Sequence, residues 1–218
     1  MNSAVILAGG SSQRFNSDVP KQFITLKQSK NLIDFSIKAF SENKGISEII
    51  LVLPIEWIKK YKERYKDYIL ISGGKNRYES SYNGVMACSD NIKNVLIHDA
   101  ARPLITEKII NDCIFYLKKY SAVAPYIDIA DSIIYKDGSN YKYLNRDFIK
   151  KVQTPQGFNI NILKEIISRN KQIGRDDMSN ILNTNDNIKT KFFKGDINNF
   201  KITNNNDLHL FNKLTYEK

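Results

Sequence analysis

Short runs of apolar and β-branched residues alternate along the chain with amphipathic stretches. Strand-like runs that alternate with helix-like segments are typical of a parallel sheet covered by helices. We therefore predict an α/β fold, a Rossmann-like and mostly parallel sheet flanked by helices. The predicted strands span residues 3–8, 48–54, 68–72, 95–103, 122–129 and 189–193. The predicted helices span residues 31–41, 55–65, 77–88, 106–119 and 159–168, and a polar helical turn follows Asp176.

A different pattern interrupts this alternation after the strand predicted at 122–129. Two strand-like runs, DSIIY and YKYLNR, flank the turn KDGSN, in which the Asp137–Gly138 pair is a strong hairpin signal. An isolated two-stranded hairpin is marginal in water, so it needs another surface to lie on. We expect residues 131–147 to form a protruding β-arm that packs on a second subunit in a homodimer. The alternative is an arm that folds back on its own domain.

The rest of the pattern indicates a single domain over residues 1–218, because no linker or internal repeat divides the chain. No run approaches about eighteen consecutive apolar residues, and the apolar run at the N-terminus lacks a basic leader. We therefore expect no membrane partner and a cytoplasmic location. Cys88 and Cys113 lie in predicted helices without metal-ligand spacing, so we interpret both as small core residues.

The formal net charge of +10 favours a polyanionic partner, such as a nucleic acid, a membrane surface or a phosphorylated small molecule. The lysines are interspersed with acidic residues, and an Asn-, Ile- and Lys-rich composition accounts for part of the excess. A nucleic-acid-binding protein is the main alternative to an enzyme, but no aromatic-and-basic strand pattern supports it. We therefore expect no nucleic-acid partner.

The first predicted strand leads into a glycine loop from Ala8 to Arg14, and Lys21 follows shortly after it. Glycines let backbone N–H groups approach an anion closely, and Arg14 and Lys21 add positive charge. The loop matches neither the GxxxxGK[ST] pattern of P-loop enzymes nor the GxGxxG of dinucleotide folds, so ATP hydrolysis and hydride transfer lose support. A bare Gly-Gly pair would be only a tight turn. With these cations beside it, the loop is interpreted as a phosphate cradle.

With Arg14, Pro20, Lys21 and Gln22 at this spacing, the loop resembles the signature of the sugar-nucleotide transferase superfamily. Three further segments, SGGKNRYES, VLIHDAARP and RDFIKKVQTPQGF, narrow the resemblance to cytidylyltransferases that act on alditol phosphates. It covers essentially the whole chain. The resemblance implies a nucleotidyltransferase that transfers CMP from CTP to an alditol phosphate and releases pyrophosphate. A guanylyl- or uridylyltransferase is the alternative, because the opening loop alone does not choose the base.

Two branches of this family compete. One makes CDP-ribitol from D-ribitol 5-phosphate for polysaccharide precursors, and the other acts on 2-C-methyl-D-erythritol 4-phosphate in isoprenoid biosynthesis. The opening LAGG, the run AVAPYIDIADSII and the ending KGDINNFKIT look more like the ribitol branch, whereas DAARP is usual in the methylerythritol branch. We therefore expect D-ribitol 5-phosphate to be the acceptor, with 2-C-methyl-D-erythritol 4-phosphate as the alternative.

The resemblance also implies roles for individual residues. Its catalytic cations are Arg14, Lys21 and Lys201. The nucleotide-binding residues are Leu7, Ala8, Gly9, Gly10, Ser11, Gly73, Arg77, Ser80 and Asp99. The acceptor-binding residues are Asp99, Arg102, Ser132, Arg146 and Arg175, with Ser132 and Arg146 reaching the active site of the neighbouring subunit. Mg²⁺ is the implied cofactor, held mainly by the CTP phosphates, with Asp99 as a candidate ligand.

Two features of this pattern leave alternatives open. Where the family often carries a Thr-Asp pair near the acceptor, this chain reads Arg175-Asp176-Asp177, so an arginine could recognise a different acceptor there. Thr154 and Gln156 belong to a recognisable motif, which is consistent with either substrate contact or structural support. Asp99 itself could be only a cap at the end of a strand.

Overall fold

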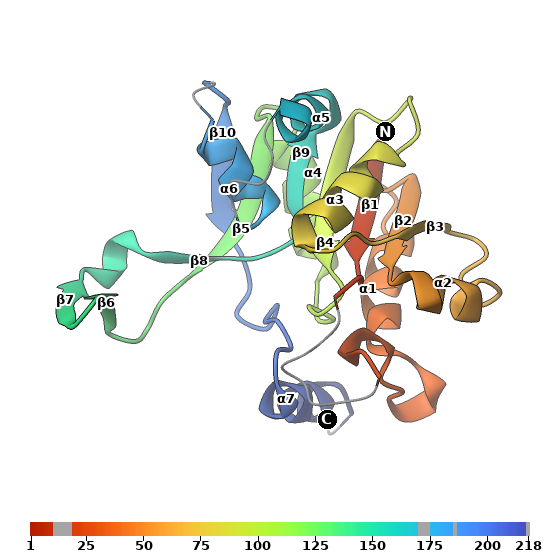
Figure 1. The fold of residues 1–218 in the computed structure, drawn as a ribbon, viewed down its shortest axis with the longest axis horizontal. Helices are drawn as coiled ribbons and strands as arrows, with labels where there is room; N and C mark the ends of the chain where they lie inside the picture. Colours follow the sequence, from red (N-terminus) through yellow and green to blue (C-terminus); the bar gives the residue numbers. More distant parts are fainter. Residues whose placement is uncertain (11–18, 170–174, 185–186, 217–218) are drawn as a thin grey trace.

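The computed structural model describes residues 1–10, 19–169, 175–184 and 187–216. In these residues the chain forms an eight-stranded mixed sheet with helices on both faces, and a separate two-stranded hairpin projects from its side (Figure 1). The predicted fold class, a mostly parallel α/β sheet flanked by helices with an inserted hairpin, is confirmed.

The secondary-structure elements follow the predicted order closely. The sheet contains β1 (Asn2–Leu7), β2 (Glu48–Leu53), β3 (Ile69–Ser72), β4 (Asn94–Asp99), β5 (Ala122–Asp128), β8 (Lys150–Val152), β9 (Gln156–Asn159) and β10 (Thr190–Lys194). The hairpin consists of β6 (Ile133–Asp137) and β7 (Asn140–Leu144). The helices are α1 (Leu32–Ser41), α2 (Ile55–Tyr61), α3 (Arg77–Met86), α4 (Glu107–Tyr116), α5 (Ile160–Arg169), α6 (Asp177–Leu182) and α7 (Asn205–Tyr216). Short 3-10 turns are η2 (Lys21–Phe23), η3 (Lys27–Ser29) and η4 (Arg146–Phe148).

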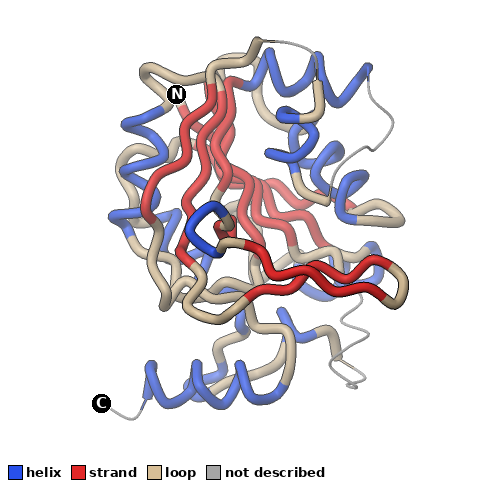
Figure 2. Tube along the Cα trace, turned by 90° about the vertical axis from the view of Figure 1, so that its left-hand side faces the viewer, coloured by secondary structure: helices blue, strands red, loops and turns tan. Residues whose placement is uncertain are grey.

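The sheet has the strand order β10-β5-β9-β4-β1-β2-β3, and β8 pairs with the far end of β5. The strands β3, β2, β1 and β4 run parallel to one another, and β9 runs antiparallel between β4 and β5. Figure 2 shows this twisted sheet between two layers of helix. Because β1 and β4 are neighbours, the loops that follow them meet at one edge of the sheet.

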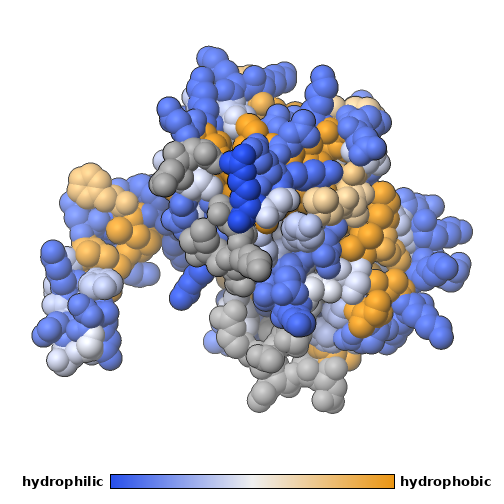
Figure 3. All heavy atoms as spheres, turned by 45° about the horizontal axis from the view of Figure 1, so that its top comes forward, coloured by the Kyte–Doolittle hydropathy of each residue, from blue (hydrophilic) through white to orange (hydrophobic). Residues whose placement is uncertain are grey.

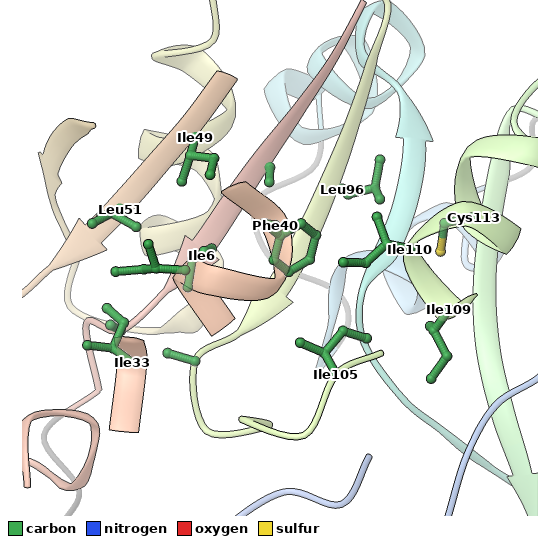
Figure 4. Close-up of a cluster of buried hydrophobic side chains, with 14 of the residues drawn as sticks. Ile6, Ile33, Phe40, Ile49, Leu51, Leu96, Ile105, Ile109, Ile110 and Cys113 are labelled. Atoms are coloured by element: carbon green, nitrogen blue, oxygen red, sulfur yellow. The ribbon is translucent and has the colours of Figure 1, made fainter. Parts of the chain in front are cut away.

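Alternate residues of each strand face opposite sides, which divides the core in two. Ala4 and Ile6 of β1 pack with α1 and α4, and Phe40 and Ile110 lie in that cluster (Figure 4). Val5, with its neighbours on the other face, packs with α3, α5 and α6. Full burial of an aliphatic side chain stabilises the fold by about 1.5–3 kcal/mol, so both clusters hold the strand ends in place.

Several predicted boundaries shift for local reasons. The strand predicted at 95–103 ends at Asp99, because residues 100–103 leave the sheet as a turn. The helix predicted at 55–65 ends at Tyr61 and gives way to a turn. Cys113 is buried in α4 as predicted, whereas Cys88 is buried just beyond the end of α3.

The hairpin β6–β7 turns at Gly138, whose φ of +57° lies in the left-handed region that favours glycine. Its strands carry mostly exposed side chains, and Tyr143 is 78% exposed. Figure 3 shows apolar side chains on this arm outside the main body. Within the described ranges, no helix has both the length and the apolar character needed to cross a bilayer.

Candidate active site

A cavity of about 550 Å³ opens at the carboxyl ends of β1, β3 and β4. It is lined by Leu7, Ala8, Gly9, Gly10, Lys21, Gln22, Gly74, Lys75, Asn76, Arg77, Ser80, Asp99, Ala100, Ala101, Lys201 and Thr203. Among the described lining residues, four carry positive charge and Asp99 alone carries negative charge. A cavity with this balance is suited to a ligand with several anionic groups.

Two glycine-containing loops form one wall of the cavity and touch through their backbones. A Cβ atom at Gly9 would lie 3.2 Å from Ser80 Oγ and 3.5 Å from Gly73 Cα. A Cβ atom at Gly73 would lie 3.3 Å from Gly9 Cα. A side chain at either position would crowd Ser80 Oγ, and one at Gly73 would also crowd Gly9 Cα, so glycine is favoured at both positions.

The N-terminus of α3 forms the next part of the wall. The Asn76 side chain caps the helix by accepting a hydrogen bond of 2.9 Å from the Glu79 N–H. Ser80 Oγ accepts a hydrogen bond from Gly74 N at 3.1 Å and donates one to the Asn76 carbonyl at 2.9 Å. The positive end of this helix and the adjacent Arg77 both favour an anion in the cavity.

Asp99 joins two cations from distant parts of the chain. Its Oδ2 lies 2.7 Å from Lys201 Nζ, and its Oδ1 lies 3.3 Å from Arg77 Nε. Burial alone would raise the pKa of Asp99, but the positive charges of Arg77 and Lys201 outweigh it and hold the pKa well below its ordinary value. Asp99 is therefore a carboxylate with both oxygens engaged.

A second carboxylate, Asp177 at the start of α6, holds Arg77 from behind. Arg77 Nη1 lies 2.8 Å from Asp177 Oδ2, and Ser81 donates a hydrogen bond to the other carboxylate oxygen. Burial alone would lower the pKa of Arg77, but the charges of Asp177 and Asp99 raise it further above its usual range. The guanidinium thus bridges α6 to the end of β4.

A chain of hydrogen bonds beneath the cavity orients Asp99. Its backbone N–H donates to Thr154 Oγ1 at 3.1 Å, which lies 3.1 Å from His98 Nδ1. His98 Nε2 lies 3.1 Å from the Arg102 carbonyl oxygen, so this nitrogen carries the proton of a neutral ring. Burial lowers the pKa of His98 to about 4, although the charge of Asp99 opposes this. Thr154 therefore supports the site from below and does not line the cavity.

The 3-10 turn η2 brings Lys21 and Gln22 to the mouth of the cavity. Lys21 Nζ donates a 2.6 Å hydrogen bond to the Ile202 carbonyl, next to Lys201. The Gln22 amide donates to the Ala8 and Gly10 carbonyls. Segments that lie far apart in the sequence thus converge on one cavity.

A family model described as "IspD: 2-C-methyl-D-erythritol 4-phosphate cytidylyltransferase" matches residues 2–215. The chain belongs to this family. It is therefore a nucleotidyltransferase of the cytidylyltransferase kind, as the sequence predicted, and the nucleic-acid-binding alternative is set aside.

Individual relatives agree with this assignment. A 2-C-methyl-D-erythritol 4-phosphate cytidylyltransferase of Clostridium perfringens is 39% identical over 217 residues, covering 95% of both chains. A bifunctional IspD/IspF enzyme of Pelagibacter ubique is 38% identical over 99% of this chain, which spans 58% of that enzyme. The solved 4-diphosphocytidyl-2C-methyl-D-erythritol synthase of Anaerococcus prevotii is similar with a TM-score of 0.85, at 25% identity, covering 100% of this chain and 96% of that one.

For this member of the IspD family, the structure brings most of the predicted site residues together. The cavity is lined by Leu7, Ala8, Gly9, Gly10, Lys21, Arg77, Ser80, Asp99 and Lys201. Gly73 lies directly behind Gly9 without lining the cavity. Arg14 and Ser11 lie outside the described residues.

The predicted acceptor residues are more dispersed. Arg102 does not line the cavity, and its Nη1 donates a 2.8 Å hydrogen bond to the Asn199 carbonyl. Ser132 and Arg146 are exposed at the base of the arm, where Arg146 Nη1 donates to the Ala130 carbonyl. Arg175 is exposed just before α6.

Sequence reasoning missed several residues of the site. Lys75 and Thr203 line the cavity, and Asp177 anchors Arg77 from below it. The order Gly-Lys-Asn-Arg contained a usable signal for Lys75, because asparagine is a preferred helix N-cap and places its neighbours at the helix N-terminus. No local signal pairs Asp177 with Arg77, because they are far apart in the sequence.

Proposed function

We propose that this chain transfers CMP from CTP to 2-C-methyl-D-erythritol 4-phosphate in isoprenoid biosynthesis. The observation that carries the proposal is the match of that family's model to residues 2–215, with relatives of the same name aligned over nearly their full length. This corrects the expected order of the two acceptors, which put D-ribitol 5-phosphate and CDP-ribitol first.

The segments that suggested ribitol belong to the common scaffold. LAGG starts with the last residue of β1, AVAPYID forms β5, and KGDINNFKIT contains Lys201. Any cytidylyltransferase with this fold needs those elements, so they discriminate poorly between acceptors. The DAARP segment, which pointed to the methylerythritol branch, contributes Asp99, Ala100 and Ala101 to the cavity.

In the proposed reaction, an oxygen of the acceptor phosphate attacks the α-phosphorus of CTP. A new P–O bond forms as the bond to the bridging oxygen breaks, and that electron pair leaves with pyrophosphate. Two like unit charges about 4 Å apart repel by about 4 kcal/mol at an effective dielectric of 20. Lys21, Arg77 and Lys201 around the cavity would offset this repulsion, together with Arg14, and no protein nucleophile is needed.

The nucleotide would lie against the loop Leu7–Gly10 and the segment from Gly74 to Ser80, with Asp99 near its ribose. Among the described residues, no group of three or more His, Cys, Asp or Glu side chains could hold a metal ion by itself, so a Mg²⁺ ion would arrive with the triphosphate. Asp99 is the described cavity carboxylate that could contact it, but both of its oxygens already pair with cations. The metal would supply charge neutralisation of the phosphates, and the triphosphate would provide most of its ligands.

The proposal also includes two expectations from the sequence, on domain organisation and on dimerisation. Residues 1–218 would form one cytidylyltransferase domain, and residues 131–147 would join two copies as a dimer. In that dimer, Ser132 and Arg146 would reach the acceptor site of the partner. Arg102 and Arg175 remain candidate acceptor residues, although neither lines the cavity of the single chain.

The deciding experiment is pyrophosphate release by the purified protein with CTP and Mg²⁺, with each acceptor supplied separately. Release with 2-C-methyl-D-erythritol 4-phosphate and not with D-ribitol 5-phosphate is expected. The reverse preference would overturn the proposed acceptor while leaving cytidylyl transfer intact. Replacing CTP by GTP or UTP tests the base in the same assay, and only CTP should support release.

A further inference from the structure

The side chain of Gln22 holds the two carbonyl groups on either side of Gly9. Its Nε2 donates a 2.6 Å hydrogen bond to the Ala8 carbonyl and a 2.8 Å hydrogen bond to the Gly10 carbonyl. The side chain is buried, with 3% of the residue exposed. One amide group thus joins η2 to the loop that follows β1.

This contact requires an amide at position 22. A –NH₂ group has two N–H donors and can satisfy two carbonyl oxygens, whereas an ionised carboxylate of the same shape only accepts hydrogen bonds. A methionine of similar length would leave both carbonyls without this partner. The Ala8 residue is buried, and a buried carbonyl that loses its hydrogen-bond partner is costly, so the loop would reorient to find another.

The hydrogen bond to Ala8 also sets the direction of the Gly9 N–H. The Ala8 carbonyl and the Gly9 N–H belong to one planar trans peptide, so they point in opposite directions. With the carbonyl held by Gln22, the N–H points away from Gln22. None of the described residues accepts a hydrogen bond from it.

Gln22 is itself held firmly by its neighbours. Phe23 is buried and stacks on Trp57 with ring centroids 4.5 Å apart and on Tyr61 at 5.0 Å. The Phe23 N–H donates to the Pro20 carbonyl at 2.8 Å, which closes the 3-10 turn. The amide is therefore in place before any ligand arrives.

We infer that Gln22 is a positioning residue for the nucleotide: it orients the Ala8–Gly10 backbone so that the loop presents its N–H groups to the cavity ligand. The inference rests on the proposed function, in which this loop contacts CTP. Gln22 would act through the backbone, so its loss should weaken nucleotide binding in the ground state and the transition state alike. Such a loss raises KM for CTP with little change in kcat.

The test compares Gln22→Met and Gln22→Glu with the wild-type protein. We expect Gln22→Met to raise both the Kd for CTP, measured by calorimetry with Mg²⁺, and the KM for CTP about tenfold or more. The acceptor KM and kcat should change much less. Asn43→Ala is the matched control, because it removes a buried side chain whose hydrogen bonds to Asn111 and Gly45 lie outside the cavity. Its KM for CTP should equal that of the wild type.

Gln22→Glu allows a second test, the pH dependence of CTP binding, which a purely structural role of Gln22 would not affect. A protonated carboxylic acid has one O–H donor, and burial beside two carbonyls raises its pKa. Relative to the wild type, CTP binding by Gln22→Glu should improve as the pH falls from about 8 to about 6. The ratio of the Kd for CTP of Gln22→Met to that of the wild type should stay constant over the same pH range.

The outcomes separate this inference from the proposed function. Wild-type protein that does not bind CTP would overturn both. Wild-type protein that binds CTP, with Gln22→Met binding it equally well, would overturn the inference alone. A Gln22→Met variant that differs from the wild type only in a lower melting temperature would also overturn the inference alone. That is the result we expect for Asn43→Ala.

Discussion

At the scale of single residues, the cavity depends on how one carboxylate is shared. Asp99 pairs with Lys201 on one oxygen and with Arg77 on the other. A bound polyanion would compete with Asp99 for both cations. In the proposed function, the carboxylate would keep the two cations in place and partly neutralised until the substrate arrives, which would lower the reorganisation needed for catalysis.

Lys201→Ala removes a cation that the proposed reaction requires. We expect kcat for pyrophosphate release to fall about a hundredfold, which corresponds to about 3 kcal/mol of lost transition-state stabilisation. Lys194→Ala is the control, because that lysine pairs with Asp128 on the surface. Equal kcat values for both variants would contradict a role for Lys201 in the chemical step.

His98 makes stability depend on pH. Its pKa in the folded protein is about 4, below the ordinary value of 6.5, because burial disfavours the charged ring. The unfolded chain therefore takes up a proton first as the pH falls. The stabilisation is complete above about pH 6.5 and is lost progressively toward pH 4, by on the order of 3 kcal/mol.

Urea unfolding at a series of pH values measures this effect. The free energy of unfolding of the wild type should decline between pH 6.5 and pH 4 more steeply than that of His98→Gln. The glutamine variant will be less stable at pH 7, so the comparison concerns slopes. Parallel slopes would show that His98 does not carry the pH dependence.

At the scale of elements, α2 supports the site although it contributes no residue to the cavity. Its Trp57 and Tyr61 stack on Phe23, which follows Lys21 and Gln22 in η2. None of the residues of α2 is fully buried. The helix packs on the core through Trp57, Ile58 and Tyr61, and the aromatic stack supports the turn that carries two cavity residues.

Trp57→Ala should weaken both stability and nucleotide binding. Loss of the ring contacts should lower the free energy of unfolding by about 2 kcal/mol. Because η2 loses its support, KM for CTP should rise more than the acceptor KM. Ile55→Ala on the same helix is the control, since Ile55 is 67% exposed and should change neither quantity.

At the scale of the whole molecule, the arm exposes apolar surface that a single chain leaves uncovered. Exposed side chains along and beside it include Ile134, Tyr135, Tyr141, Tyr143 and Phe148. Phe148 is 83% exposed. Apolar surface gathered on a projecting hairpin is typical of an interface, which supports the proposed dimer.

A Tyr143→Ser, Phe148→Ser double variant should shift the protein from dimer to monomer in sedimentation velocity at micromolar concentration. If Arg146 reaches the partner's acceptor site, the monomer should also show a raised acceptor KM with unchanged CTP binding. Met86→Ser removes an exposed apolar side chain outside the arm and should leave the dimer intact. A wild-type protein that sediments as a monomer would refute the dimer directly.

The sequence predicted the fold well because its signals are local. Short apolar and β-branched runs located the strands, amphipathic stretches located the helices, and Asp137–Gly138 located the hairpin turn. The cavity followed from the rule that loops meet at the carboxyl ends of parallel strands. Contacts between distant segments could not be predicted: Asp177 with Arg77, and Thr154 beneath Asp99, depend on how α6 and β9 pack.

The contact between Gly9 and Gly73 has a consequence for substrate discrimination. The wall at Gly9 is main chain backed by Gly73, so close that an added Cβ at Gly73 would lie 3.3 Å from Gly9 Cα, and neither position has a side chain that could rotate aside. A pocket bounded by side chains can widen by changing rotamers, but one bounded by backbone can widen only if a strand end moves. The gap beside this wall therefore has a fixed width. Rejection of larger bases would then be a property of the sheet itself and would persist through most substitutions at the rim.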